Sequence, residues 1–275
     1  MPELPEVETI CRGLAPLIIG KIIVAIETSG KDLRQPVPLT EMAAALPGQT
    51  IKAIRRRAKY LLIECGGLLV IHLGMTGNLG VFPANLPPEK HCHVRFRFAD
   101  GDELRYRDSR RFGRIILLPA PFHEAERQFF AATGPEPLAC DATRDAARLA
   151  EKTSRMQAPI KAALLSGALI AGIGNIYACE SLFRARLDPR RAAGSLTLAE
   201  WQRLLAAIQE VLREAIACGG STISDYVNAQ QKPGYFQMNF MVYGRAGETC
   251  QNCGAAIAQT KIAGRSTFFC PKCQE

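Results

Sequence analysis

The sequence predicts an α+β fold, in which an N-terminal antiparallel β-sandwich with flanking helices precedes a C-terminal helical domain. Short runs of β-branched residues, separated by glycine-containing turns, recur up to Leu118, as in a sandwich of two layers. From Phe122 onwards the apolar residues recur instead at helical spacing. The length of 275 residues exceeds the usual size of one domain, so we expect two domains with a sizeable core in each.

The elements can be placed in chain order. An amphipathic helix opens the chain, because the apolar residues between Val7 and Ile19 have helical spacing that stops at Gly20. The expected strands are Lys21–Thr28, Thr50–Ile54, Tyr60–Cys65, Leu68–Leu73, His93–Phe98, Glu103–Tyr106 and Arg114–Leu118. The expected helices are residues 123–131, 143–153, 159–166, 173–185 and 197–217.

Four segments follow from this order. Residues 1–132 are the predicted sandwich domain, and residues 133–140, which include Gly134 and two prolines, are the hinge. Residues 141–240 are the helical domain, and residues 241–275 form a terminal hairpin. The polar, glycine-bearing stretch 219–236 is predicted to be a long functional loop.

The composition narrows the class of partner and the compartment. A net charge of +8 favours a polyanion such as nucleic acid, although ordinary solvated surface could carry the same excess. No apolar run has the length of a membrane span, and the start lacks a signal-peptide pattern, so we expect a cytoplasmic protein. Six of the ten cysteines are scattered singly, as buried free thiols usually are.

The remaining four cysteines are grouped near the end of the chain. Cys250 and Cys253 are separated by two residues, as are Cys270 and Cys273, and 16 residues lie between the pairs. This spacing is typical of two knuckles that present four thiolates to one zinc ion. Four protein ligands leave no position for water, so the ion is expected to be structural; disulfides are the alternative, which a cytosolic compartment disfavours.

Two short segments could bind phosphate. Lys261 and Arg265 lie between the cysteine pairs, where a rigid hairpin would present them to an anion, or where they could be a solvated turn tip. Gly172 and Gly174 precede Asn175 at the start of a helix, whose first N–H groups can bind phosphate. The segment lies between two helices and lacks a third glycine, which indicates a helix-hairpin reader of a nucleic-acid backbone rather than a dinucleotide site.

The amino terminus carries a possible nucleophile. Removal of Met1 would leave Pro2 as a terminal secondary amine beside the Glu3 carboxylate. Such an amine titrates at about 7.7 to 8, so it can attack an aldehydic carbon and form a cationic imine, with Glu3 as acid or base. The alternative is that Pro2 and Pro5 only lead a helix.

Several segments together closely resemble bacterial formamidopyrimidine-DNA glycosylase, of the family that also includes endonuclease VIII. The resemblance covers the whole chain in order and is very specific, although Ser109 replaces the family's more common proline. The segments that carry it are Pro2–Thr9, Arg57–Leu61, His72–Gly77, Arg110–Gly113, Gly172–Ala178 and Ala263–Cys270.

The resemblance implies a base-excision repair enzyme, a bifunctional glycosylase and abasic-site lyase with a helix-two-turn-helix domain and a zinc ribbon. It would remove oxidised purines such as 8-oxoguanine and formamidopyrimidines from duplex DNA and then cut the strand. By similarity, Pro2 attacks the sugar, Glu3 transfers a proton, Lys59 serves β-elimination and Arg265 serves δ-elimination. Lys59 could instead contact only a phosphate, and the high pKa of arginine favours Arg265 as a phosphate clamp.

The resemblance also implies contacts with damaged DNA. Met75, Arg110 and Phe112 would fill the gap left by the flipped base; as alternatives, Met75 and Phe112 could be core residues, but glycines beside them mark loop tips. Ser221, Thr222, Ile223 and Tyr226 would belong to the loop that closes over the base. The implied DNA-binding residues are His72, His91, Arg110, Arg155, Lys161, Asn175, Tyr243 and Lys261, among which Arg110 would donate a hydrogen bond to the orphaned cytosine.

Three other functions compete with this one. Endonuclease VIII prefers oxidised pyrimidines, and Leu4 with the intact Arg110–Phe112 segment argues against it. A noncatalytic zinc-ribbon protein would not need Pro2 and Glu3. A zinc nucleobase deaminase needs a His-x-Glu motif, which residues 91–93 do not supply. We therefore expect a monomer that acts on damaged double-stranded DNA with one structural Zn²⁺, no organic cofactor and no membrane partner.

Overall fold

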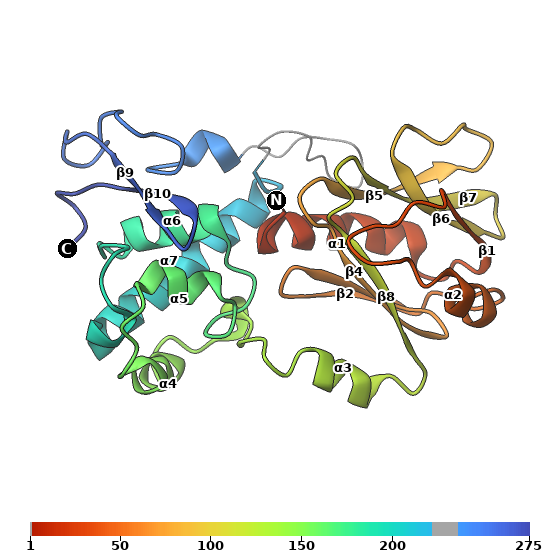
Figure 1. Ribbon diagram of the computed structural model, residues 1–275, viewed down its shortest axis with the longest axis horizontal. Coiled ribbons are helices and arrows are strands. Elements are labelled where there is room, and N and C mark those ends of the chain that lie inside the picture. The colour runs from red at the N-terminus through yellow and green to blue at the C-terminus, as the bar shows by residue number, and fades with distance from the viewer. Residues whose placement is uncertain (1, 222–235) are drawn as a thin grey trace. The chain divides into compact units, whose positions relative to one another are not determined.

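The computed structural model describes residues 2–221 and 236–275, which divide into two compact units (Figure 1). Unit 1 comprises Met1–Ala131 and Cys218–Tyr235, and of the second segment the structure describes residues 218–221. Unit 2 comprises Ala132–Ala217 and Phe236–Glu275. Each unit has its own core, and each is described by itself.

Unit 1 is an antiparallel β-sandwich with helices. Its two four-stranded sheets have the strand orders β1-β6-β7-β5 and β2-β3-β4-β8. Apolar residues of both sheets and of α1 share one core, so the predicted two-layered sandwich is confirmed. The elements are α1 (Leu4–Ile18), β1 (Ile23–Thr28), α2 (Leu39–Ala45), β2 (Ala53–Arg57), β3 (Tyr60–Glu64), β4 (Gly67–His72), β5 (Gly77–Pro83), β6 (Cys92–Phe98), β7 (Asp102–Asp108), β8 (Arg114–Pro119) and α3 (His123–Phe129).

The second sheet is covered on both faces. Leu61 and Ile63 of β3 point into the sandwich core, whereas Leu62 between them packs with Phe122 and Phe130 in a separate apolar cluster. A strand that is buried on both faces has no polar side to alternate with. This explains why β3 and β4 are continuous apolar runs in the sequence.

Four elements of unit 1 differ from the prediction. Helix α1 begins at Leu4 rather than Val7, β2 lies three residues later than expected, and α2 and β5 were not predicted. Strand β5 contains glycines that weaken its strand pattern. At Gly77 a side chain has no room, because a Cβ would lie 2.2 Å from the Leu73 carbonyl oxygen and 2.6 Å from the Tyr106 hydroxyl. Close packing therefore requires glycine where propensity opposes a strand.

Unit 2 is a helical domain that ends in a two-stranded hairpin. The four helices predicted here have the observed bounds to within two residues. The ribbon that carries the grouped cysteines packs on Cys179 and Phe183 of α6. The elements are η1 (Pro137–Ala139), α4 (Arg144–Thr153), α5 (Ile160–Leu165), α6 (Asn175–Arg184), η2 (Ala193–Ser195), α7 (Leu198–Ala217), η3 (Phe236–Asn239), β9 (Ala258–Ile262) and β10 (Arg265–Phe269).

Helix α7 is the longest element of unit 2, with 20 residues. Trp201, Leu205 and Ile208 lie on its buried face, and Glu200, Glu210 and Glu214 keep its other side polar. Among the described residues, no helix combines the length and the apolar content that crossing a bilayer requires.

Candidate functional site

Pro2 and Glu3 are buried at the start of α1. Glu3 is the N-cap residue, and its amide donates to Oε2 of Glu6 over 2.8 Å. The other carboxylate oxygen of Glu6 accepts from the amide of Ser221 (2.8 Å) and from its hydroxyl (3.1 Å). Glu6, 2% exposed, therefore joins the proposed nucleophile segment to the start of the predicted recognition loop. Thr222, Ile223 and Tyr226 lie outside the described residues.

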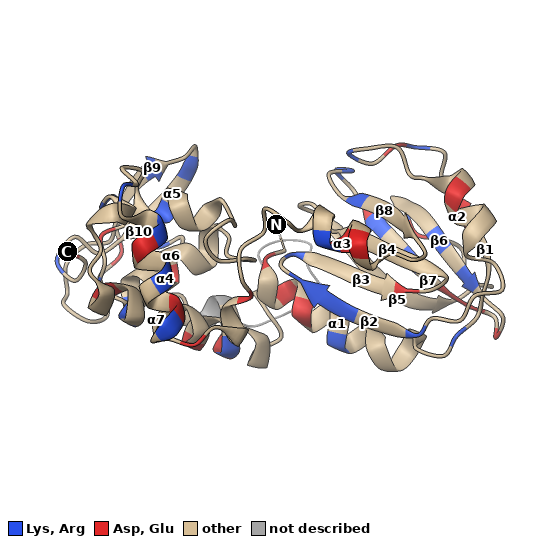
Figure 2. Cartoon of the chain, turned by 90° about the horizontal axis from the view of Figure 1, so that it is seen from below, with Lys and Arg blue, Asp and Glu red and all other residues tan. Residues whose placement is uncertain are grey.

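Lys59 lies in the tight turn between β2 and β3. Ala58, the other turn residue, has φ 53°, and its carbonyl accepts from Arg56 over 3.0 Å. Arg56 also pairs with Glu8 of α1 at 2.7 Å. Burial acts to raise the pKa of Glu8, but Arg56 and Arg12 hold it below its ordinary value. The basic end of β2 (Figure 2) is thus bound by an ion pair to α1, the helix whose N-cap is Glu3.

His72, at the end of β4, is an uncharged ring near neutral pH. Burial, assisted by the nearby Lys59, lowers its pKa to about 4. Its Nδ1 accepts from the amide of Gly74 over 3.1 Å, and its ring lies 4.8 Å from that of Tyr60. His72 therefore supports the turn before Met75. Its contact with a DNA phosphate stays a prediction.

The predicted gap-filling residues lie at two loop tips. Met75 is partly exposed between β4 and β5, and Phe112 is 42% exposed between β7 and β8. The guanidinium of Arg110 lies 4.6 Å from the centroid of the Phe112 ring. Neither apolar residue belongs to a core, so the alternative that Met75 and Phe112 are core residues does not fit the structure.

Two further predicted contacts are also on the surface. His91 is exposed directly before β6, in the left-handed conformation with φ 67°. Arg155 is exposed just after α4. Both positions are accessible, and their contact with DNA stays a prediction.

In unit 2, Lys261 and Arg265 lie on the β9–β10 hairpin. Ala263 (φ 48°) and Gly264 (φ 71°) form its two-residue turn, the backbone shape that matches the twist of paired strands. Lys261 pairs with Ser266 across the ladder, and both cations are exposed. The hairpin can therefore present two positive charges to an anion.

Two other predicted DNA-contacting residues form hydrogen bonds with this hairpin. The ammonium of Lys161 donates to the Ser266 carbonyl (3.0 Å) and to the Thr267 hydroxyl (2.7 Å), and Lys161 is 0% exposed. The amide nitrogen of Asn175 donates to the same carbonyl over 2.9 Å. Lys161 therefore positions the strand that begins with Arg265, and its contact with DNA stays a prediction.

Tyr243 packs beside the same hairpin. Its ring lies 5.2 Å from that of Phe268, and its backbone amide donates to Glu180 over 2.8 Å. Burial raises the pKa of Glu180, although the amides of Met241, Tyr243 and Val242 oppose that rise. Glu180 thus orders the segment that leads into the ribbon.

The four grouped cysteines form one cluster. Their sulfur atoms all lie within 4.8 Å of one another, with Cys250 and Cys273 at 3.9 Å and Cys253 and Cys270 at 3.5 Å. Four sulfurs around one zinc ion are about 3.8 Å apart, whereas a disulfide needs about 2 Å. The described cysteines form no disulfide. The geometry fits one structural zinc held by four thiolates.

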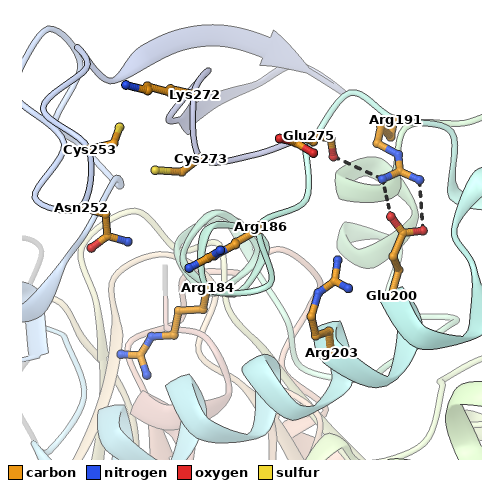
Figure 3. Close-up of a pocket in the computed structure, with 10 residues that line it drawn as sticks. All are labelled: Arg184, Arg186, Arg191, Glu200, Arg203, Asn252, Cys253, Lys272, Cys273 and Glu275. Carbon is orange, nitrogen blue, oxygen red and sulfur yellow. Dashed lines mark hydrogen bonds and ion pairs between the residues drawn. The ribbon is translucent and has the colours of Figure 1, made fainter.

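A cavity of about 670 Å³ lies beside this cluster in unit 2 (Figure 3). Two of the four arginines that line it form ion pairs: Arg184 pairs with Glu214 and Glu210, and Arg191 pairs with Glu200. Arg184 ends α6, whereas Asn175 begins it, so the cavity is at the other end of that helix from the hairpin contacts. We do not assign it to the catalytic site.

Sequence reasoning did not find two residues that organise the site. Glu6 lies three residues after the N-cap, the spacing of a capping box. Asp108 is 0% exposed and continues the inward-facing series of Leu104 and Tyr106 on β7. An acidic residue on the buried face of a strand is rare unless it is paired. The alternation of Leu104, Tyr106 and Asp108 was therefore the sequence signal that could have identified Asp108.

The sandwich, the helical domain and the four-cysteine hairpin define a zinc-finger protein of the helix-two-turn-helix class. Three family models match in order: the formamidopyrimidine-DNA glycosylase N-terminal domain over residues 1–115, the formamidopyrimidine-DNA glycosylase H2TH domain over 133–227, and the zinc finger found in FPG and IleRS over 247–275. The chain belongs to the formamidopyrimidine-DNA glycosylase family.

Individual relatives agree with this assignment along the full length. Formamidopyrimidine-DNA glycosylases of Alkalilimnicola ehrlichii and Laribacter hongkongensis are 46% and 45% identical, and each match covers 100% of both chains. A Lactococcus lactis Fpg solved with an abasic site containing DNA is 37% identical, with a TM-score of 0.89 over 100% of both chains. The same enzyme with a Fapy-dG containing DNA also has a TM-score of 0.89, at 37% identity over 99% of this chain and 100% of the other.

Proposed function

We propose that this protein is a bifunctional DNA glycosylase and abasic-site lyase of base excision repair, which removes oxidised purines from duplex DNA. The observation that carries the proposal is the match of 46% identity over the whole of both chains to a formamidopyrimidine-DNA glycosylase. The relatives solved with abasic-site and Fapy-dG DNA support the same substrate class. We infer that the protein acts in the bacterial cytoplasm, where such a substrate is found.

The first step uses the amino end of unit 1. After removal of Met1, the lone pair of the Pro2 nitrogen attacks C1′ of the damaged nucleotide, and the bond from C1′ to the base breaks. The bonding electron pair leaves on the base, which takes up a proton, and the Pro2 nitrogen loses its own proton. Glu3, 2% exposed beside it, supplies the proton for the opening sugar and later returns as a base. Loss of the ring bond leaves a cationic imine between Pro2 and C1′, which withdraws electrons from C2′.

The second step cuts the strand. The imine makes the C2′ hydrogen acidic, and loss of that proton expels the 3′ phosphate. A further elimination expels the 5′ phosphate and leaves a one-nucleotide gap. We assign the first elimination to Lys59. Arg265, exposed at the first position of β10, then acts as a phosphate clamp.

The other assignments concern binding. Met75, Arg110 and Phe112 fill the gap left by the flipped base, and Ser221 begins the segment that covers that base. The division into residues 1–132, 133–140, 141–240 and 241–275 assigns chemistry to the first segment and backbone contacts to the last two. The assignment of the Pro2 nitrogen as the nucleophile depends on none of these contacts, so it can be tested directly.

Reduction of the imine by borohydride tests the nucleophile. The purified protein should form a covalent adduct with a duplex that contains an 8-oxoguanine·cytosine pair, and Pro2→Gly should lose it. Pro5→Ala is the matched control, since it removes a buried proline from the same helix start and should still form the adduct. Peptide mapping of the adduct should locate DNA on Pro2.

Two results would contradict the proposal. One is an active protein whose intact mass retains Met1, because its Pro2 nitrogen would be an amide. The other is an adduct on a side chain elsewhere. An oxidised-pyrimidine duplex in the same assay distinguishes the endonuclease VIII preference, since the better substrate accumulates adduct faster.

A further inference from the structure

The two loops that carry the gap-filling residues are packed backbone against backbone. A Cβ added at Gly74 would lie 2.4 Å from the carbonyl carbon of Phe112 and 2.5 Å from the nitrogen of Gly113. A Cβ at Gly113 would lie 1.7 Å from the Tyr106 hydroxyl and 2.8 Å from the His72 carbonyl oxygen. Glycine is therefore required on both sides of this contact, and the loops cannot separate without losing it.

One buried carboxylate holds both loops. Asp108, 0% exposed at the end of β7, accepts from the Thr76 hydroxyl over 2.5 Å and from the Arg110 amide over 3.3 Å with Oδ1. Its Oδ2 accepts from the Gly113 amide over 2.8 Å and from the Tyr106 hydroxyl over 3.2 Å. Thr76 follows Met75, while Arg110 and Gly113 flank the exposed tip at Phe112.

The surroundings of Asp108 fix it in turn. Burial and the adjacent carboxylate raise the pKa of Tyr106, so its hydroxyl remains a neutral donor. The Nε2 atom of His93 lies 3.0 Å from the Asp108 carbonyl oxygen, and its Nδ1 lies 2.9 Å from the Ser29 hydroxyl. The amide of Asp108 donates to the His91 carbonyl over 3.0 Å. A carboxylate fixed in this way cannot follow a loop that moves.

We propose that Asp108 is the positioning residue that holds Met75, Arg110 and Phe112 as one preorganised wedge. This inference rests on the proposed gap-filling role of those three residues. Asp108 itself touches no DNA in this proposal. It acts through Thr76, the Arg110 amide and the Gly113 amide, and so sets where the three tips stand before DNA arrives.

Preorganisation matters here because the wedge must replace stacking and pairing at the moment when the base leaves the duplex. Loops that are already ordered lose little conformational freedom on insertion, whereas loose loops must be ordered by the binding energy. Arg110 is the donor that would face the orphaned cytosine. Its backbone must be held in place if its side chain is to distinguish cytosine from adenine. Loss of Asp108 should therefore reduce gap filling and opposite-base discrimination more than imine chemistry.

The test replaces Asp108 and one of its partners. Asp108→Asn retains the shape of the side chain but replaces one carboxylate oxygen with an NH₂ group. That group is a donor and would face the donors that surround Asp108. Thr76→Val removes one hydroxyl, and Thr76→Ser retains it. We expect Asp108→Asn to lower the ratio of excision rates opposite cytosine and adenine by about tenfold, Thr76→Val by less, and Thr76→Ser to preserve it. A fluorescent purine beside the lesion should report the same order for wedge insertion.

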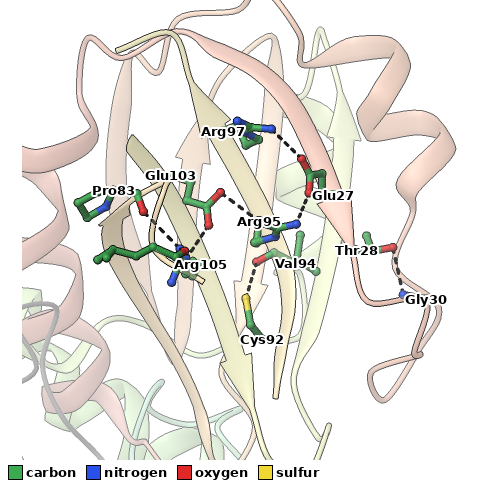
Figure 4. A network of polar contacts seen from close by, with 11 residues as sticks. Glu27, Thr28, Gly30, Pro83, Cys92, Val94, Arg95, Arg97, Glu103 and Arg105 are labelled. Atoms are coloured by element: carbon green, nitrogen blue, oxygen red, sulfur yellow. Dashed lines mark hydrogen bonds and ion pairs between the residues drawn. The ribbon is translucent and has the colours of Figure 1, made fainter. Parts of the chain in front are cut away.

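Two measurements separate positioning from general damage to the fold. Borohydride trapping on a single-stranded oligonucleotide with an abasic site needs no wedge, so it should be unchanged in all three variants. Glu103→Gln is the matched control, because Glu103 is a 0% exposed carboxylate on the same strand, paired with Arg105 (Figure 4). It should lower the melting temperature as Asp108→Asn does, yet leave the discrimination ratio unchanged.

The outcomes distinguish the two proposals. If Arg110→Ala and Phe112→Ala do not change insertion or discrimination, the gap-filling assignment is wrong and the inference falls with it. If they reduce both while folded Asp108→Asn does not, only the inference is wrong. Should Asp108→Asn fail to fold, an equal ratio in Thr76→Val and Thr76→Ser would overturn it.

Discussion

The two units hold the side chains of the proposed site by opposite chemistry. In unit 1, the buried carboxylates of Glu6 and Asp108 accept from amides and hydroxyls of the segments around Glu3, Ser221 and the two wedge loops. In unit 2, the buried Lys161 and the amide of Asn175 donate to backbone and hydroxyl oxygens of the Arg265 hairpin. The first arrangement gathers donors around anions, and the second gathers acceptors around a cation.

This difference determines what each unit is sensitive to. Burial lowers the pKa of His72, which must gain a charge when the pH falls, so unit 1 should be weakened by acid. The hairpin of unit 2 depends on the metal that closes its base, so unit 2 should be weakened by chelation. The four predictions below test this contrast.

Zinc removal should have the largest effect. A structural zinc contributes about 10 to 16 kcal/mol to the folding of small zinc domains, far more than the hairpin's other contacts can supply. Extraction by a chelator, or Cys270→Ser, should abolish DNA binding and release one zinc per chain, measured by mass spectrometry. The sandwich signal in circular dichroism should persist, and retained DNA affinity after complete zinc loss would refute the contrast.

Acid should act on unit 1 through His72. Its pKa is 6.5 unfolded and about 4 folded, so between those values the unfolded state binds more protons. Stability is therefore fully present above about pH 6.5 and falls by up to about 3 kcal/mol as the pH drops to about 4. Urea denaturation of the wild type across this range should show the slope.

His72→Asn is the matched variant, because asparagine can still accept from the Gly74 amide and does not titrate. Its free energy of unfolding should be lower than that of the wild type at neutral pH, but should change less between about pH 6.5 and about 4. The same slope in both proteins would assign the acid sensitivity to other groups.

Removal of the buried ammonium should loosen unit 2. Lys161→Met leaves the Thr267 hydroxyl and part of the Ser266 carbonyl without a donor, at a cost of about 1 to 3 kcal/mol. Trp201, the chain's one tryptophan, is buried in α7, so its fluorescence during denaturation reports on this unit. Lys152→Met, an exposed lysine whose ammonium donates to Ala168, should cost far less; equal losses would contradict the buried role.

Glu6→Gln should have the smallest effect on stability. A glutamine has one acceptor oxygen, so it can serve the Glu3 amide or Ser221 but not both, at a cost of about 1 to 2 kcal/mol. The rate of imine trapping should fall because Glu3 or Ser221 is no longer fixed. Glu41→Gln, an exposed glutamate on α2, provides the control, and identical trapping by both variants would exclude this role for Glu6.

The sequence predicted what depends on local pattern. Residues 250–273 specify the metal by spacing alone, since a two-residue separation brings two thiolates to one ion. The helices of unit 2 could be placed because their apolar period is long and regular. Strand β5 was missed, because glycine at Gly77 is required by packing on Tyr106 and leaves no local strand signal.

What the amino-acid sequence by itself determined is therefore the class of each domain, the four zinc ligands and the exposed tips marked by glycine. Only the tertiary structure decided which buried charges support them: Glu6 meets Ser221 from 215 residues away, and Lys161 meets Thr267 from 106. The physical reason is that a charge is satisfied by whichever donors or acceptors surround it after folding. Those neighbours are fixed by packing, which sequence spacing does not encode.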